Sequence, residues 1–363
     1  TGTQIYTGDV TLSGAARTLT ATNSSAVTFS STIDGTQNLT VATDGLTTFD
    51  GIVGGGTAVS AIAITGTGGL DLDAAITSAA SLAVTGATNL GAGVITSGAQ
   101  TYTGAVTLSA DNTLTSSGTG NLLFSSTTKS DGTARALILS TGGNTTFTGA
   151  VGGTGALSGL TSTTAAFTAA AIKVGGTISI TNSGTGAITG VISDGATAAS
   201  LTKAGAGTLT LTGVNTFTGD ITITDGDLSI DGAGQLGGAT GTYAGAISVG
   251  TGDDLIYTST EAQTLSGVIS GAGGVVKEEN SVLTLSGDNT FTGLLDINDG
   301  EVIITGGSSG TANLASSVAI ASGAILTVST DLTNGDAISS STGTGLVDTG
   351  AIINMPINLV NNQ

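Results

Sequence analysis

The chain of 363 residues contains no cysteine and no histidine. These absences exclude disulfide bonds, thiolate nucleophiles, imidazole catalysis and the usual zinc sites. Basic residues are also scarce, with six lysines and arginines against 25 acidic residues and a net charge of −19. Such a chain has too few cations to neutralise nucleic-acid phosphates or anionic lipid headgroups. We therefore expect no nucleic-acid partner and no binding to an anionic membrane surface.

Long apolar runs and a leader-like start are missing as well. No stretch approaches the ~20 apolar residues that span a bilayer, so we expect no membrane insertion. The first ten residues, TGTQIYTGDV, lack the basic start and the apolar centre of a signal peptide. From this beginning we expect a mature piece of a longer chain.

Glycine is abundant, with 61 positions, and hydrophobic residues make up 39% of the chain. Many of the hydrophobic residues are β-branched, which suits pleated and half-buried strands. Apolar and polar residues alternate, as from Thr208 to Thr212, and Asp-Gly or Asn-Gly pairs separate the short runs. No amphipathic helical pattern survives the glycines. The pattern predicts an all-β protein.

One segment occurs twice in the second half of the chain. TLTLTGVNTFTGDITITDG at 208–226 returns as VLTLSGDNTFTGLLDINDG at 282–300, with 12 of 19 positions identical. The full copies cover 200–232 and 274–306. So little reactive chemistry lies in this segment that we expect its role to be architectural.

A longer repeat occupies the first half. QIYTGDVTLS near the start returns as QTYTGAVTLS, which defines two long repeats over 4–99 and 100–175. Repeats at fixed offsets are typical of solenoids, in which each unit buries its apolar face only against its neighbours. We therefore expect residues 1–363 to form one continuous parallel β-solenoid, a single elongated rod with turns of about 20 residues.

The repeats resemble known families of bacterial surface proteins. AGAGTLTLTGVNTFTGDITITDGDLSI (204–230) resembles the passenger-associated repeat of bacterial autotransporters, and 263–293 looks like a more diverged copy. The first half is similar to strand repeats of filamentous-haemagglutinin-like adhesins. The resemblance implies a right-handed parallel β-helix, exported to the surface of a Gram-negative bacterium. It also implies a structural or adhesive role without catalysis, with surface glycans or proteins of a host or neighbouring cell as partners.

The matched positions of the two copies form a structural signature. We expect Phe217 and Phe291 to pack at corners and Asn215 and Asn289 to cap the same turn. The remaining signature residues are glycines and Asp-Gly pairs, for which turns are the simplest interpretation. They are Gly219, Asp225, Gly226, Gly293, Asp299 and Gly300.

Closely spaced carboxylates raise the question of calcium. Asp225, Asp227 and Asp231 offer three carboxylates within one short segment. A turn of type I′ or a related type explains the same residues, and we favour it because a calcium site needs more converging oxygens. We expect no other cofactor.

Adjacent acids are the available catalytic material, as in Asp253–Asp254 and Glu278–Glu279. Glycoside cleavage needs two carboxylates about 5–9 Å apart across a sugar, whereas neighbouring strand residues point to opposite faces. A secreted carbohydrate-active β-helix, a glycoside hydrolase or lyase, is therefore the alternative to a non-enzymatic protein. Sugar platforms also favour aromatic residues, and the chain has four tyrosines and no tryptophan.

For two further patterns we expect no functional role. Lys203 and Lys277 occupy equivalent repeat positions, where an exposed ion pair across turns would contribute only ~0–1 kcal/mol. Threonine-rich stripes such as TLT and TIT resemble those of ice-binding solenoids. The spacing of these threonines along the sequence is irregular, which makes ice binding a remote alternative.

The chain ends suggest a mode of assembly. The first residues already have the strand pattern, and near the other end it is continued by Ile352, Ile353, Ile357, Leu359 and Val360. Pro356 removes one donor from this ladder. A solenoid without caps exposes unpaired backbone groups at its last turns. We therefore expect either further passenger sequence on both sides or copies that stack end to end.

Overall fold

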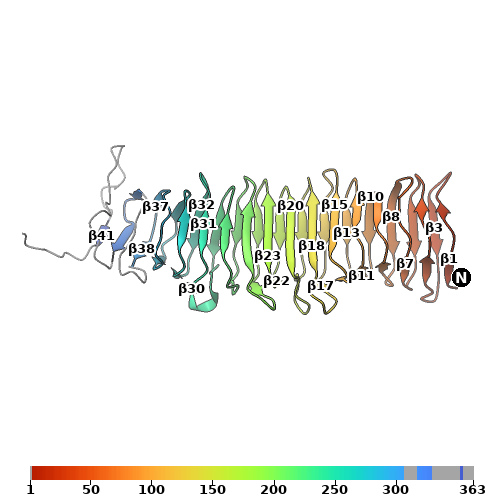
Figure 1. Ribbon diagram of the computed structural model, residues 1–363, viewed down its shortest axis with the longest axis horizontal. Helices are drawn as coiled ribbons and strands as arrows, with labels where there is room; N and C mark the ends of the chain where they lie inside the picture. Colours follow the sequence, from red (N-terminus) through yellow and green to blue (C-terminus); the bar gives the residue numbers. More distant parts are fainter. Residues whose placement is uncertain (1, 306–316, 329–351, 355–363) are drawn as a thin grey trace, which may run out of the picture. The chain divides into compact units, whose positions relative to one another are not determined.

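The computed structural model describes residues 2–305, 317–328 and 352–354. The predicted final strand residues Ile357, Leu359 and Val360 lie outside this part. Within it the secondary structure is β apart from one 3₁₀ turn, η1 (Gly238–Thr240). The strands of successive turns pair in parallel, so the chain is a parallel β-solenoid and the predicted all-β class is confirmed (Figure 1).

The chain divides into two compact units. Unit 1 comprises residues 1–181 and 195–197, and unit 2 comprises residues 182–194 and 198–363. In both units a turn of the solenoid carries up to three short strands, and each strand pairs with its counterpart in the next turn. The turns are 18 to 27 residues long, as shown by the paired residues Asp71–Asn89 and Leu228–Leu255, so many exceed the expected 20.

Unit 1 has three stacks of strands. The first stack contains β1 (Gln4–Tyr6), β4 (Val27–Phe29), β7 (Thr47–Phe49), β9 (Leu70–Leu72), β11 (Thr88–Leu90), β14 (Val106–Leu108), β17 (Thr128–Ser130) and, through a bridge at Val151, β22 (Ile172–Val174). The second contains β2 (Val10–Thr11), β5 (Ile33–Asp34), β12 (Val94–Thr96), β15 (Asn112–Ser116), β18 (Ala136–Thr141), β20 (Gly159–Thr164) and β23 (Thr177–Asn182). The third contains β3 (Arg17–Thr20), β6 (Leu39–Ala42), β8 (Val59–Thr65), β13 (Gln100–Tyr102), β16 (Leu122–Phe124), β19 (Thr145–Phe147) and β21 (Phe167–Ala169). The long strand β10 (Ile76–Val84) belongs to the second stack at its start and to the third at its end.

Unit 2 is stacked in the same way. One stack contains β24 (Gly186–Ile188), β27 (Leu209–Leu211), β29 (Leu228–Gly232), β32 (Asp254–Ser259), β35 (Gly274–Lys277), β37 (Leu295–Ile297) and β39 (Val318–Ile320). Another contains β26 (Ser200–Ala204), β28 (Ile221–Ile223), β31 (Ile247–Val249) and β34 (Ile269–Gly271). The third contains β30 (Thr242–Tyr243), β33 (Gln263–Leu265), β36 (Val282–Leu285), β38 (Glu301–Ile304), β40 (Ile325–Val328) and β41 (Ile352–Asn354), while β25 (Ile192–Asp194) lies outside these pairings.

The core follows from the alternation of the sequence. In β27, Leu209 and Leu211 are fully buried while Thr210 between them is partly exposed, and the same pattern holds in most three-residue strands. Each buried aliphatic side chain contributes roughly 1.5–3 kcal/mol relative to exposure. Because parallel register places like residues over like, the apolar side chains form continuous ladders through each unit.

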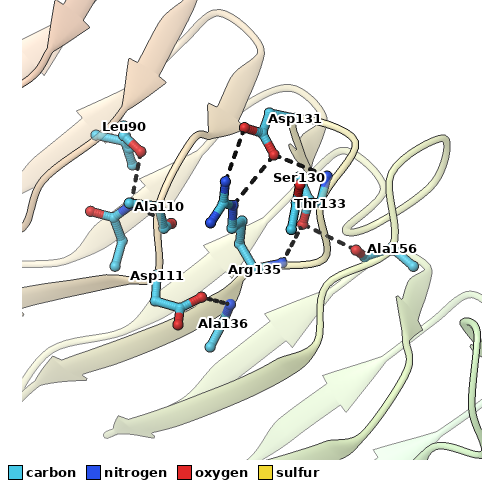
Figure 2. Close-up of polar contacts among 10 residues, drawn as sticks. Leu90, Ala110, Asp111, Ser130, Asp131, Thr133, Arg135, Ala136 and Ala156 are labelled. Atoms are coloured by element: carbon cyan, nitrogen blue, oxygen red, sulfur yellow. Dashed lines mark hydrogen bonds and ion pairs between the residues drawn. The ribbon is translucent and has the colours of Figure 1, made fainter.

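Carboxylates close many corners of the solenoid. Asp34 Oδ1 accepts the backbone N–H groups of Gly56 and Thr57, at 2.7 and 2.9 Å, in the following turn. In the same way Asp111 Oδ1 accepts the N–H of Ala136 at 2.8 Å (Figure 2). Gly56 and Thr57 lie in a corner and Ala136 is the first residue of β18, so the acids supply acceptors where the strand ladder is absent or just begins.

One loop of unit 1 carries an ion pair. Arg135 Nη2 lies 3.3 Å from Asp131 Oδ2, and Ser130 Oγ accepts the Arg135 N–H and donates to the carbonyl of Ala156 (Figure 2). Both charged side chains are substantially exposed, so we expect the pair to contribute little to stability. No helix in the described residues is long and apolar enough to cross a membrane.

Candidate functional site

The first repeated corner of unit 2 is built around a buried lysine. Lys203 lies on β26 and is fully buried. Its Nζ donates to the carbonyl oxygens of Ala204 at 3.1 Å, Gly205 at 2.6 Å and Asp225 at 2.9 Å. Because Asp225 belongs to the next turn, the ammonium group holds two successive corners together. Burial lowers the pKa of Lys203, and the carboxylates of neighbouring aspartates oppose this shift.

The second copy repeats the arrangement with a different neighbour. Lys277, at the end of β35, is fully buried and donates to the carbonyls of Glu278 and Glu279. Its Nζ lies 5.8 Å from the centroid of the Tyr257 ring, which is within range of a cation–π contact. Burial lowers the pKa of Lys277, and Asp299 and the two glutamates oppose the shift.

These contacts replace the exposed ion pair considered from the sequence. Neither ammonium group donates to a carboxylate, and among the described residues the ion pair of Arg135 and Asp131 is the one salt bridge. Lysine fits this place because it is long enough to reach a corner from a strand and carries three donors. The lysines therefore stabilise the repeat and offer no free amine.

Each asparagine of the two copies accepts a backbone N–H group from the turn that precedes its own. Asn215 is buried, and its Oδ1 accepts the N–H of Ile192 at 2.9 Å. Its Nδ2 donates to the carbonyls of Gly213 and Gln235. Asn289 accepts the N–H of Ile269 at 2.8 Å in the same manner. The two asparagines lie in different turns and bond to backbone groups.

The phenylalanines of the signature lie in the core. Phe217 is fully buried beside Tyr243, with ring centroids 5.5 Å apart, and Phe291 is 2% exposed. Behind each ring the chain passes close to the preceding turn. A Cβ atom at Gly219 would lie 2.3 Å from the Ala199 carbonyl oxygen, and one at Gly293 would lie 2.1 Å from that of Gly273.

The Asp-Gly pairs form tight corners. Gly226 and Gly300 both have φ of 69°, and neither preceding aspartate has a positive φ. A type I′ turn needs positive φ at both central residues, so these corners are of another type. A Cβ atom at Gly226 would lie 2.4 Å from the Gly207 carbonyl oxygen, and one at Gly300 would lie 2.4 Å from that of Ser281. The positive φ and the lack of room for a Cβ atom therefore require glycine at both positions.

The structure assigns separate positions to the calcium candidates. Asp227 Oδ1 accepts the N–H of Asp254 at 3.1 Å in the next turn, while Asp231 Oδ1 accepts the N–H of Gly232 at 2.7 Å. Asp225 contributes its backbone carbonyl to the lysine corner. In the part of the chain that the structure describes, no group of three or more acids is arranged to hold a metal ion.

Among the adjacent acids, Asp253 is bonded to the backbone and Glu278 to a side chain. Asp253 is 6% exposed, and its Oδ1 accepts the N–H of Gly226 at 2.8 Å. Asp254 begins β32, and burial, together with Asp227, raises its pKa. Glu278 accepts from Asn298 Nδ2 at 3.1 Å.

A shallow hollow does bring two other carboxylates together. It has a volume of about 290 Å³ and lies where β36 meets β38. Asp299 and Glu301 line it beside small and aliphatic residues, and no aromatic side chain does. Both acids have partners, since Asp299 Oδ1 accepts the N–H of Gly300 and Glu301 Oε1 accepts from Thr327 Oγ1.

Unit 1 contains a buried aromatic ladder that the sequence reading missed. The rings of Tyr102, Phe124 and Phe147 stack with centroids 5.1 and 4.4 Å apart, and Phe167 follows at 6.2 Å. Tyr102 donates to Gln100 Oε1 at 3.0 Å inside the core. In the sequence, an aromatic residue recurs once per turn before Thr-Gly, Ser-Ser or Thr-Ala, and this pattern could have predicted the ladder.

Comparison with known families identifies the repeated segments. The model of the passenger-associated transport repeat matches residues 201–230 and 275–304, which lie inside the two copies found in the sequence. No curated protein and no solved structure matches the chain. The repeats and the parallel solenoid together confirm the resemblance to an autotransporter passenger β-helix. This repeat family implies a secreted or surface-exposed protein.

Proposed function

We propose that the chain is a non-enzymatic structural or adhesive protein displayed at the surface of a Gram-negative-type bacterium. The proposal is carried by the buried lysines, asparagines and phenylalanines of the matched repeats, which bond or pack inside the solenoid. Lysines, asparagines and phenylalanines of both copies are buried and bonded or packed within unit 2. Such a unit presents a long backbone-supported surface on which polar side chains can meet a partner.

The use of the carboxylates supports a non-enzymatic role. Acids are the available catalytic groups in a chain without histidine or cysteine, and many of them accept backbone N–H groups at corners. Asp194 and Asp220 do so in unit 2, toward Thr218 and Ala246. A carboxylate that completes a corner is held in place by the backbone N–H groups that it accepts.

Adhesion can be tested with the folded chain on a solid support. Beads coated with the purified protein are incubated with epithelial monolayers and with bacterial lawns, and retained beads are counted after washing. We expect retention on at least one surface above that of beads coated with heat-unfolded chain. Equal retention of folded and unfolded coatings on every surface would contradict an adhesive role.

A carbohydrate-active enzyme is the second candidate, because Asp299 and Glu301 share one hollow. Their partners within the fold, and the lack of an aromatic platform in that hollow, favour the non-enzymatic proposal. The variants Asp299→Asn and Glu301→Gln separate the candidates, since an enzyme that uses this hollow would lose polysaccharide cleavage in both.

A further inference from the structure

One outward face of unit 1 carries two parallel rows of small, mainly hydroxylated side chains. The rows lie on the third stack, from β3 to β21, at alternate positions of each strand. The first row is Thr18, Thr40, Ala63, Ala83, Thr101, Leu123, Thr146 and Thr168. The second row is Thr20, Ala42, Thr65, Thr85, Thr103, Ser125, Thr148 and Ala170.

The register of the strands produces an order that the sequence conceals. Along the chain these positions recur at unequal intervals, for example 20 residues from Thr65 to Thr85 and 18 from Thr85 to Thr103. In the structure, corners of different length account for these unequal intervals. Thr85 donates its N–H to the carbonyl of Ile64, and Thr103 donates to that of Val84, so both stay in the ladder. The irregular spacing that weakened an ice-binding interpretation is therefore a property of the corners.

The longest uninterrupted hydroxyl series is in the second row. Thr65, Thr85, Thr103, Ser125 and Thr148 follow one another over five successive turns, and all five are exposed. Thr148 Oγ1 donates to the carbonyl of Phe124 at 3.3 Å, and the hydroxyl oxygen can still accept a hydrogen bond from water. Beneath the rows, the stacked rings of Tyr102, Phe124 and Phe147 support the sheet.

Charge is absent from this face. None of the positions in either row is acidic or basic, although the chain has a net charge of −19. The corresponding positions in unit 2 include Asp231, Glu278 and Asp296. The lack of charge is thus a local property of this face in unit 1. It favours a neutral partner whose order a carboxylate on the face would disturb.

We propose that these hydroxyl rows bind the ordered water of an ice surface. Parallel pairing repeats the hydroxyls every ~4.8 Å from turn to turn. In tetrahedral water with hydrogen bonds of ~2.75 Å, second-neighbour oxygens lie about 4.5 Å apart. Over the five-turn series the mismatch reaches only about 1 Å, so the hydroxyls can replace a row of lattice oxygens.

Other occupants fit the face less well. A sugar chain would need exposed aromatic rings, and the four rings of the ladder under this face are buried. A second copy would bury only a few hundred Å² on rows this narrow, below the ~800 Å² per partner of a stable interface. The proposal is independent of adhesion, which needs no order in the bound water.

The test is incorporation of the full chain into slowly growing ice. A cold finger grows ice from a dilute protein solution, and the protein concentrations in the ice and in the liquid are compared. The disrupting variant is Thr103→Lys, with Thr85→Lys as a second variant in the same row. The matched control is Thr107→Lys, which adds the same charge four residues away on β14, in the first stack. Circular dichroism verifies that each variant is folded.

The wild-type chain and Thr107→Lys should enter the ice several-fold more than Thr103→Lys and Thr85→Lys. Exclusion of the wild-type chain from ice to the extent seen for serum albumin would overturn the proposal. Equal incorporation of all four proteins would overturn it as well. Concentration-dependent association in the ultracentrifuge that Thr103→Lys abolishes, without enrichment of the wild-type chain in ice, would assign the face to a second copy instead.

Discussion

The two units solve the same packing problem with different side chains. Unit 1 fills its core with stacked aromatic rings and closes corners with carboxylates that accept backbone amides. Unit 2, which contains both passenger-associated repeats, adds buried lysines that donate to backbone carbonyls. A corner has unpaired donors and acceptors of both kinds, so an acid satisfies one set and a lysine the other. The comparison shows that several ionisable residues in the described part of the chain complete the hydrogen bonds of the backbone at corners.

The largest expected effect lies in the aromatic ladder of unit 1. Phe124→Ala removes the ring between Tyr102 and Phe147 and leaves a cavity in the core. We expect a loss of roughly 3–5 kcal/mol in the free energy of unfolding, measured by urea denaturation. Leu123→Ala changes the partly exposed neighbour in β16 and should cost much less. Similar losses for both variants would mean that the rings do not support this unit.

The lysine corners of unit 2 should come next. Lys203→Ala leaves the carbonyls of Ala204, Gly205 and Asp225 without their donor and opens a cavity. We expect a loss of roughly 2–4 kcal/mol, whereas Lys129→Ala on a partly exposed strand position should change stability by less than about 0.5 kcal/mol. Equal midpoints of urea denaturation for the two variants would show that the buried lysine does not hold the corner.

Removing a buried hydroxyl should stabilise unit 1. Thr88 is buried in β11, and its Oγ1 has no hydrogen-bond partner. Thr88→Val keeps the shape and removes the unpaired group, so we expect a gain of about 1 kcal/mol. Thr107→Val, at a partly exposed position of β14, is the control and should be nearly neutral. A thermal melt in which Thr88→Val is less stable than the wild-type chain would mean that the hydroxyl has a partner in solution.

The smallest effect concerns the pH dependence of unit 2. Burial raises the pKa of Asp254 in the folded state above its value in the unfolded chain. The folded state therefore binds this proton more tightly, and its contribution to stability, present below the unfolded pKa, is lost as pH rises through the folded pKa. Asp254→Asn should raise the melting temperature slightly at pH 7 and leave it unchanged near pH 3. A larger gain at pH 3 than at pH 7 would contradict this sign.

The sequence was enough to predict the fold because its signals are local and repeated. Alternation in segments such as Leu209-Thr-Leu211 and the exact return of NTFTG determine strands and turns without distant information. The roles of the signature residues were harder to predict. Whether Lys203 ends in water or in a corner depends on the next turn, 22 residues away, and composition suggests the exposed position.

The register of the threonine rows could not be predicted for the same reason. Unequal loop lengths between Thr65, Thr85 and Thr103 hide an alignment that only strand pairing reveals. The aromatic ladder needs the same information, because neighbours in the stack are a full turn apart in sequence. Properties that depend on a single strand were therefore predictable, and properties that depend on adjacent turns were not.

The central proposal is that the acids that close the described corners serve the scaffold and not catalysis. It is tested most directly by incubating the purified chain with a panel of polysaccharides and measuring new reducing ends and unsaturated products. The account predicts no release above the buffer blank, for the wild-type chain and for Asp299→Asn and Glu301→Gln alike. Release by the wild-type chain that either variant abolishes would contradict the account and identify the hollow between β36 and β38 as an active site.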